Sequence, residues 1–281
     1  MNGPFAADFG SAVMPVGKPI FDPNWLLDEL ELRLTRYDLD RAESQARAGS
    51  NMMLSVAEGF FRTADLETSN WWHDHGLCDA DEQTQREILL SMLVRSPKQL
   101  GWAAVTLLAH LGAHLLDSEV VVRVTRWVTS VAVTRWIRDG VALSLIVPWF
   151  ERQSEENVIR TLVELCESEN TAEIRMGLMG AAAYLRKRIE VSGSMGQTML
   201  AVCRRLAGRT DAETACAVGW VLRELLTKDE KRFYPELLLL TSHLSRQAMR
   251  TAVERLDRER RQRATTQWRR AQSRRVVPVD R

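Results

Sequence analysis

The sequence TAEIRMGLMGAAAYLRK (171–187) aligns, at an offset of forty residues, with DAETACAVGWVLRELLTK (211–228). The offset pairs alanine with alanine, glutamate with glutamate and leucine with leucine: Ala172 with Ala212, Glu173 with Glu213, and Leu185 with Leu225. A similar apolar, helix-like run precedes each stretch, at 158–166 and 199–206. Helix pairs that recur about every 40 residues are typical of HEAT-like repeats, which stack because no unit can bury its apolar face alone. We therefore predict an all-α fold, a HEAT-like helical-repeat solenoid with a concave groove.

Signals for helix starts occur along the rest of the chain, and no stretch is a convincing strand. Side chains that can cap a helix precede periodic runs of about 10–18 residues. They stand at Asp22, at Asp79 or Asp81, at Ser96, at Asp117, at Ser154, at Asn170, at Thr210 or Asp211, and between Ser242 and Ser245. The β-branched run at 128–133 is short and lies between helical runs, so we interpret it as a junction between two helices.

Composition and cysteine usage limit the class of protein. The chain has 281 residues, of which 45% are hydrophobic and 27% are charged, as in soluble globular proteins. Its apolar runs, such as 141–147 and 237–240, are far shorter than the ~20 residues that cross a bilayer, and its N-terminus lacks a basic region followed by an apolar one. The four cysteines are far apart, which favours buried free thiols in a reducing compartment. His73, His75 and Cys78 lack a second set of ligands, so we expect no metal site.

Positive charge is concentrated at the C-terminal end of the chain. The net charge is only +1, but residues 250–281 contain eleven arginines, no lysine and four acids, which leaves the preceding 249 residues with a net charge of −6. An arginine-rich end suits a polyanion, and the alternative is a solvated terminal helix with a frayed tail. Together with the Gly- and Pro-rich start, this predicts three parts: a flexible arm (1–22), the solenoid (23–261) and an Arg-rich tail (262–281).

A tryptophan and an arginine lie away from the apolar face of the run 217–228. At about 100° per residue, its apolar stripe is formed by Val218, Val221, Leu222 and Leu225. The opposite side carries Trp220, Arg223, Glu224 and Thr227. Because the stripe already provides a core face, Trp220 is available for another role or for packing against the next repeat.

Residues 217–256 resemble the C-terminal part of the AlkD family of alkylpurine DNA glycosylases. Members of that family carry a GW-x-LRE helix followed, after the next helix, by an LSR-x-A run; here these are residues 219–224 and 244–248. The stretch 171–187 is similar to the family's preceding helix, in which an arginine near the start faces DNA, and that position is Arg175 here. The resemblance is good over roughly residues 135–256, weak over 24–134, and absent in the first 22 and last 20 residues.

The resemblance implies a solenoid that lays duplex DNA in its concave groove and hydrolyses the N-glycosidic bond of a cationic N3- or N7-alkylated purine. Relatives gather two tryptophans and an aspartate around the damaged nucleotide, which implies Trp136, Trp220 and Asp139 here. The family usually places the aspartate four residues after the first tryptophan and this chain has three, but the match of DGVA to the family's Asp-x-aliphatic-Ala favours Asp139. The residues that hold phosphates would be Arg175, Arg223, Arg246 and Arg250.

The chemistry gives a reason for these residue types. Alkylation makes the purine cationic and a good leaving group, so the positively charged sugar left behind limits the rate. A carboxylate can stabilise that sugar and orient a water, which is often worth a few kcal/mol, and each aromatic face adds about 0.5–2 kcal/mol of attraction for positive charge. No group of residues suggests a tight base pocket, so the base need not be enclosed. We expect a cytoplasmic monomer, associated with the nucleoid if bacterial, that binds double-stranded DNA with alkylated purines and needs no cofactor.

Each candidate residue also has a structural interpretation. These are a core position for Trp136, an ion pair of Asp139 with Arg135, and an ion pair of Arg175 with Glu173 or with a neighbouring helix. The corresponding alternative function is a non-catalytic HEAT-like module that binds unusual DNA structures or a protein partner through the same groove.

Overall fold

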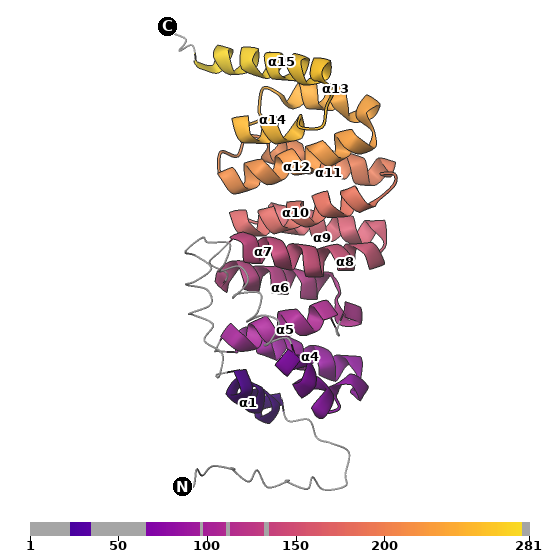
Figure 1. Ribbon diagram of the computed structural model, residues 1–281, viewed down its shortest axis with the longest axis vertical. Helices are drawn as coiled ribbons and strands as arrows, with labels where there is room; N and C mark the ends of the chain where they lie inside the picture. Colours follow the sequence, from indigo (N-terminus) through magenta and orange to yellow (C-terminus); the bar gives the residue numbers. More distant parts are fainter. Residues whose placement is uncertain (1–22, 35–65, 96–97, 111–112, 132–134, 277–281) are drawn as a thin grey trace, which may run out of the picture.

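The computed structural model describes residues 23–34, 66–95, 98–110, 113–131 and 135–276, and every regular element in these ranges is a helix (Figure 1). Residues 66–74 are α-helical. The other α-helices are α1 (Pro23–Leu34), α4 (Glu82–Val94), α5 (Lys98–His110), α6 (Ser118–Val131), α7 (Arg135–Val141), α8 (Val147–Arg152), α9 (Glu155–Glu167), α10 (Thr171–Lys187), α11 (Gly193–Leu206), α12 (Ala212–Lys228), α13 (Glu230–Leu240), α14 (Arg246–Ala252) and α15 (Arg258–Val276). Short 3-10 turns occur at Leu77–Asp79 and Ala113–Leu115, and a π-helical turn occurs at Ala142–Ile146. The predicted all-α class is confirmed.

The helices form an elongated stack in which chain order follows position (Figure 1). The two aligned stretches of sequence are α10 and α12, and each packs against the helix before it, α9 and α11 respectively. The helices α10, α12 and α14 also pack closely along one another, whereas α9 and α11 touch much less. Closer spacing in one layer curves a stack toward that layer, so α10, α12 and α14 line its inner face. The predicted HEAT-like helical repeat is confirmed.

One continuous apolar core runs through the whole stack. It extends from Leu26 in α1 to Ala264 in α15. Near its N-terminal end Trp71 and Trp72 are buried and pack against each other with ring centroids 6.2 Å apart. These two tryptophans therefore serve the core of the N-terminal part and not a ligand.

Side-chain caps begin most of the helices. Asp211 accepts a hydrogen bond from the backbone N–H of Thr214 at 2.8 Å, and Asn170 accepts one from Ala172 at 2.9 Å. The predicted starts at Asp81, Asp117, Ser154 and Ser245 are capped in the same way. The run at 128–133 was predicted to be a helix junction, and α6 indeed ends at Val131 and α7 begins at Arg135.

Three capped helix starts were not predicted. Ser192 caps α11, Asp229 caps α13 and Asp257 caps α15. Asp229 is the only residue between α12 and α13, so neither proline nor glycine marks that break in the sequence. The starts predicted at Asp22 and Ser96 lie outside the described residues.

Glycine allows α14 to approach the inner helix α12. A Cβ atom on Gly219 would lie 2.7 Å from the carbonyl oxygen of Ala248 and 2.7 Å from Cβ of Thr251. The carbonyl oxygen of Ala248 belongs to the backbone, so it cannot move aside unless α14 itself moves. The glycine of the GW-x-LRE sequence is therefore required by helix packing, and it brings α14 beside Trp220.

A wide turn follows α7 directly. The backbone N–H of Val147 bonds to the carbonyl oxygen of Ala142, five residues earlier, and α7, this turn and α8 form one unbroken helix. Pro148 lies just beyond the turn and has no N–H to donate, so it cannot continue the ordinary α-helical ladder. The π turn accommodates this interruption three residues after Asp139.

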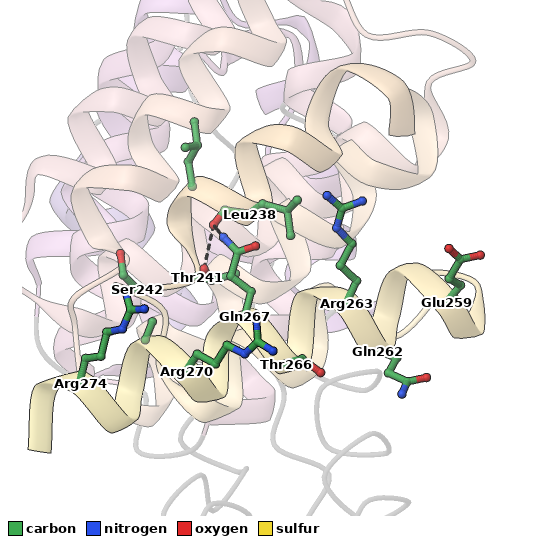
Figure 2. A pocket seen from close by; sticks show the side chains of 12 residues that line it. Leu238, Thr241, Ser242, Glu259, Gln262, Arg263, Thr266, Gln267, Arg270 and Arg274 are labelled. Carbon is green, nitrogen blue, oxygen red and sulfur yellow. Dashed lines mark hydrogen bonds between the residues drawn. The ribbon is translucent and has the colours of Figure 1, made fainter.

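The Arg-rich end of the chain forms a packed helix. In α15 the side chain of Ala264 is fully buried, and Trp268 Nε1 donates to the carbonyl oxygen of Leu244 at 2.8 Å. Gln267 reaches from α15 to α13 and donates to the carbonyl oxygen of Leu238, also at 2.8 Å (Figure 2). These contacts hold α15 against α13 and against the loop that precedes α14.

The predicted boundary between the solenoid and the Arg-rich tail falls inside α15. It was expected at residue 261, but residues 262–276 belong to the same helix and continue the stack. The expected flexible arm, 1–22, and the last residues, 277–281, lie outside the described residues.

All four cysteines are free thiols. Cys166 and Cys203 are buried, as predicted; burial raises the pKa of Cys166 to about 12 and raises the pKa of Cys203 as well. The prediction of burial is wrong for Cys78, which is exposed in a 3-10 turn with its Sγ 3.2 Å from Nδ1 of His73.

Candidate functional site

Asp139 and Arg175 form a two-pronged ion pair between α7 and α10. Arg175 Nε donates to Oδ1 of Asp139 at 2.9 Å, and Nη2 donates to Oδ2 at 2.7 Å. The side chain of Arg175 is 1% exposed and that of Asp139 is 18% exposed. The planar guanidinium group therefore fixes the orientation of a carboxylate that still reaches solvent. Of the structural interpretations considered for Arg175, the structure shows the pair with a neighbouring helix; the partner of Asp139 is Arg175 and not Arg135.

Trp220 completes a cluster with this ion pair. The guanidinium carbon of Arg175 lies 4.9 Å from the centroid of the Trp220 ring, a cation–π distance. Trp220 is half-buried, because α12 supplies the core from its opposite side with Val218, Val221, Leu222 and Leu225. The inner face thus brings together an aspartate from α7, an arginine from α10 and a tryptophan from α12.

The pair compensates the charge of Arg175, whose guanidinium is buried. Removal from water lowers the pKa of this guanidinium, but the hydrogen bonds and attraction of Asp139 outweigh that effect and leave the pKa raised. A charged guanidinium with its two best donors on Asp139 has little surface left for another anion. The structure therefore places Arg175 behind the carboxylate.

A second ion pair, missed by the sequence analysis, borders the cluster. Arg138 Nη2 lies 3.0 Å from Oε1 of Glu213, and the carbonyl oxygen of Glu213 accepts from Nη1 of Arg175 at 3.4 Å. Glu213 aligns with Glu173 in the repeat, and Glu173 likewise has an arginine of an earlier helix, Arg126, 3.7 Å away. That alignment was a signal that an acid near the start of each inner helix pairs with a preceding helix.

Arg223 is paired with acids. Its Nε and Nη2 donate to Oε1 of Glu224 at 3.2 and 3.0 Å, and its Nη1 donates to Glu254 at 2.5 Å. The hydrogen bond from Arg223 lowers the pKa of Glu254. Glu224 is 1% exposed and also accepts from Arg186 at 3.2 Å and from Arg255 at 3.1 Å. Arg223 is therefore part of a buried network, and Arg186 and Arg255 are its exposed members.

Arg246 and Arg250 are the two predicted phosphate-binding arginines whose side chains form no ion pair within the described residues. Both side chains are exposed on α14, and no hydrogen bond or ion pair joins either of them to the described part of the chain. They line a groove of about 570 Å³ between α14 and α15. Trp136 lies in α7, three residues before Asp139, and its side chain lies outside the described residues.

A curved helical stack with an ion-paired carboxylate, a half-buried tryptophan and free arginines on its inner face is a repeat protein suited to a polyanion. The family described as DNA alkylation repair enzyme matches residues 76–256, and the chain belongs to that family. This agrees with the resemblance to the AlkD family and places the chain in DNA repair. No curated protein and no solved structure matched the chain.

Two further observations concern other classes of site. Within the described ranges, no group of three or more His, Cys, Asp or Glu side chains is arranged to hold a metal ion. No helix in the same ranges is long and apolar enough to cross a bilayer.

Proposed function

We propose that this protein is a DNA glycosylase that releases cationic N3- or N7-alkylated purines from duplex DNA bound along its inner face. The observation that supports this most directly is the cluster of Asp139, Arg175 and Trp220. It combines an oriented carboxylate with an aromatic ring on the side of the stack where a duplex would lie.

The reaction breaks the bond between C1′ of the sugar and the purine nitrogen. The alkylated purine leaves with the bonding electron pair and becomes neutral, which leaves positive charge on the sugar. Asp139 would stabilise that charge and orient a water, which adds to C1′ and loses a proton. Trp220 would lie against the sugar, where its face attracts the same positive charge.

Arg175 would act as a positioning residue in this reaction. Because its guanidinium binds both carboxylate oxygens, it limits the rotation of Asp139 and leaves each oxygen one further lone pair. Phosphates would be held instead by Arg246 and Arg250, whose side chains are exposed and form no hydrogen bond or ion pair in the described part of the chain. Trp136 would be the second aromatic wall, from the same helix as Asp139.

The test is the release of free bases from duplex DNA treated with a methylating agent. We expect the wild-type protein to free N7-methylguanine or N3-methyladenine, and the variant D139N to lose most of this activity. D79N is a matched control, because Asp79 is an exposed aspartate on a 3-10 turn near α4. Release by D139N at the wild-type rate would contradict the role of Asp139.

A second outcome would favour the alternative function. If neither the wild-type protein nor D139N frees any base but both retard duplex DNA in a gel, the chain is a DNA-binding module in which the ion pair is structural. If neither binds DNA, the inner face is not a DNA surface.

A further inference from the structure

The helix α15 lies outside residues 76–256, which the repair family covers. It carries eight arginines and one glutamate over nineteen residues. Its two neighbouring arginines Arg269 and Arg270 line different grooves, one on either side of the helix. The two sides of α15 therefore present separate basic surfaces.

The groove between α14 and α15 is strongly basic. Its charged lining residues are Arg246, Arg250, Glu254, Arg261 and Arg269. The side chains of Arg246, Arg250 and Arg269 form no hydrogen bond or ion pair within the described ranges, whereas Arg261 donates to the backbone carbonyls of Glu254 and Leu256. The one acid, Glu254, is already bonded to Arg223. Three guanidinium groups without a hydrogen-bonded acid thus line one open groove.

This groove continues the inner face on which the candidate site lies. Arg223 is three residues after Trp220 on α12, and its bond to Glu254 reaches the wall of the groove. On the other side, Gln247 of α14 lies 3.9 Å from Sγ of Cys216, one turn before Trp220. A ligand that extends from Trp220 toward the C-terminal end of the stack therefore enters this groove.

The groove on the other side of α15 does not lie on the inner face of the stack. It lies between α13 and α15, measures about 760 Å³, and includes Arg263, Arg270 and Arg274 in its lining (Figure 2). The helix α13 is not one of the closely packed inner helices, so this groove does not continue the inner face.

We propose that α15 binds the phosphate backbone of the same duplex, beyond the damaged nucleotide, through Arg269 in the groove between α14 and α15. The proposal rests on the proposed function in one respect, that duplex DNA lies along the inner face. A duplex presents a regular row of phosphates, and guanidinium groups without acidic partners bind phosphate oxygens in pairs. Trp268 holds α15 in place through its bond to Leu244, so these charges are fixed on a packed helix.

Two variants of adjacent residues test this proposal. R269E and R270E change the same charge on the same helix, but only Arg269 faces the groove that continues from Trp220. We expect R269E to weaken binding of an undamaged duplex of about 25 base pairs by about tenfold, and R270E to change it less than twofold. The milder variant R269Q should lower the slope of log affinity against log salt by about 0.9, the value for one phosphate contact. Circular dichroism checks that each variant keeps its helices.

The results separate this proposal from the proposed function. Equal losses in R269E and R270E, or a loss only in R270E, would overturn the role of α15, whether or not the wild-type protein releases bases. A loss confined to R269E supports it even if no base is released, because the assay uses undamaged DNA. Unchanged DNA binding in all three variants would also overturn the proposal. It is the result expected if the groove binds an acidic protein instead of DNA.

Discussion

Replacing Asp139 by asparagine changes both the reaction and the stability of the fold. The amide keeps one acceptor oxygen, but its NH2 group faces a donor of Arg175, whose side chain is 1% exposed. Breaking one side of a buried ion pair costs about 3–5 kcal/mol. Asp139 is 18% exposed, so we expect D139N to lower the free energy of unfolding by about 3 kcal/mol. A domain with ~5–15 kcal/mol of stability stays folded after that loss.

The loss in catalysis is separate from the loss in stability. Removal of one oriented group that stabilises the transition state slows a reaction by about 10²–10³-fold. The double variant D139N/R175M distinguishes the two effects, because it removes the unpaired buried charge and replaces it with an apolar side chain. Such replacements are often neutral for stability. We expect the double variant to regain most of the unfolding free energy of the wild-type protein while its rate of base release stays low.

The measurements are urea unfolding followed by circular dichroism and single-turnover release of methylated bases at saturating protein. The reasoning is refuted if D139N unfolds at the wild-type urea concentration, since Arg175 would then tolerate the loss of its partner. It is equally refuted if D139N/R175M releases bases as fast as the wild-type protein, because stability alone would then account for the defect.

Two further predictions concern the helices that carry the site. G219A should lower the free energy of unfolding by about 1–3 kcal/mol in urea titrations, because its new Cβ would lie 2.7 Å from the backbone oxygen of Ala248; an unchanged midpoint would show that α14 can move away freely. For Asp211, burial alone would raise the pKa of its carboxyl, but the N–H of Thr214 and the guanidinium of Arg209 lower it below the ordinary value. Its ionised form therefore stabilises the fold above about pH 4 and loses that effect at lower pH. D211A should lose about 1 kcal/mol at pH 7 and D211N, which still caps α12, much less; equal losses would mean that the charge and not the cap matters.

Local signals in the sequence account for most of the predicted fold. Capping side chains such as Asp211 and Asn170 mark a helix start within three residues, and the repeated pattern of α10 and α12 shows which helices are equivalent. These features depend on neighbours in sequence, so they are visible without coordinates. The break at Asp229 was missed because a single residue separates the two helices there, and its capping aspartate stands in an otherwise continuous helical run without proline or glycine at the break.

The sequence indicated which residues belong to the candidate site, but it did not indicate which of them contact one another. Family resemblance pointed to Asp139, Arg175 and Trp220, and the structure brings the three together. That Arg175 is buried against Asp139 depends on two helices whose residues are 36 positions apart, and no local pattern contains that information. The roles of these residues stay predictions.

Composition alone also did not predict whether the C-terminal end is a packed helix or a solvated tail. An arginine-rich segment has the same composition whether it is a solvated tail or a packed helix. The features that distinguish them are Ala264 and Trp268, four residues apart on one side of α15. The few apolar residues of α15 among its eight arginines do not produce a clear amphipathic signal.

The network around Glu224 has a kinetic consequence. One buried carboxylate, helped by Glu254, is shared by three arginines from three successive parts of the stack, so a surplus of positive charge remains where the repeats join. Its field acts on a distant polyanion over about 8 Å at physiological ionic strength, before any contact forms. Dissolved salt weakens this long-range steering much more than it weakens the pairs held within the protein. We therefore expect the charges that fix the repeats to one another also to raise the encounter rate with a polyanion.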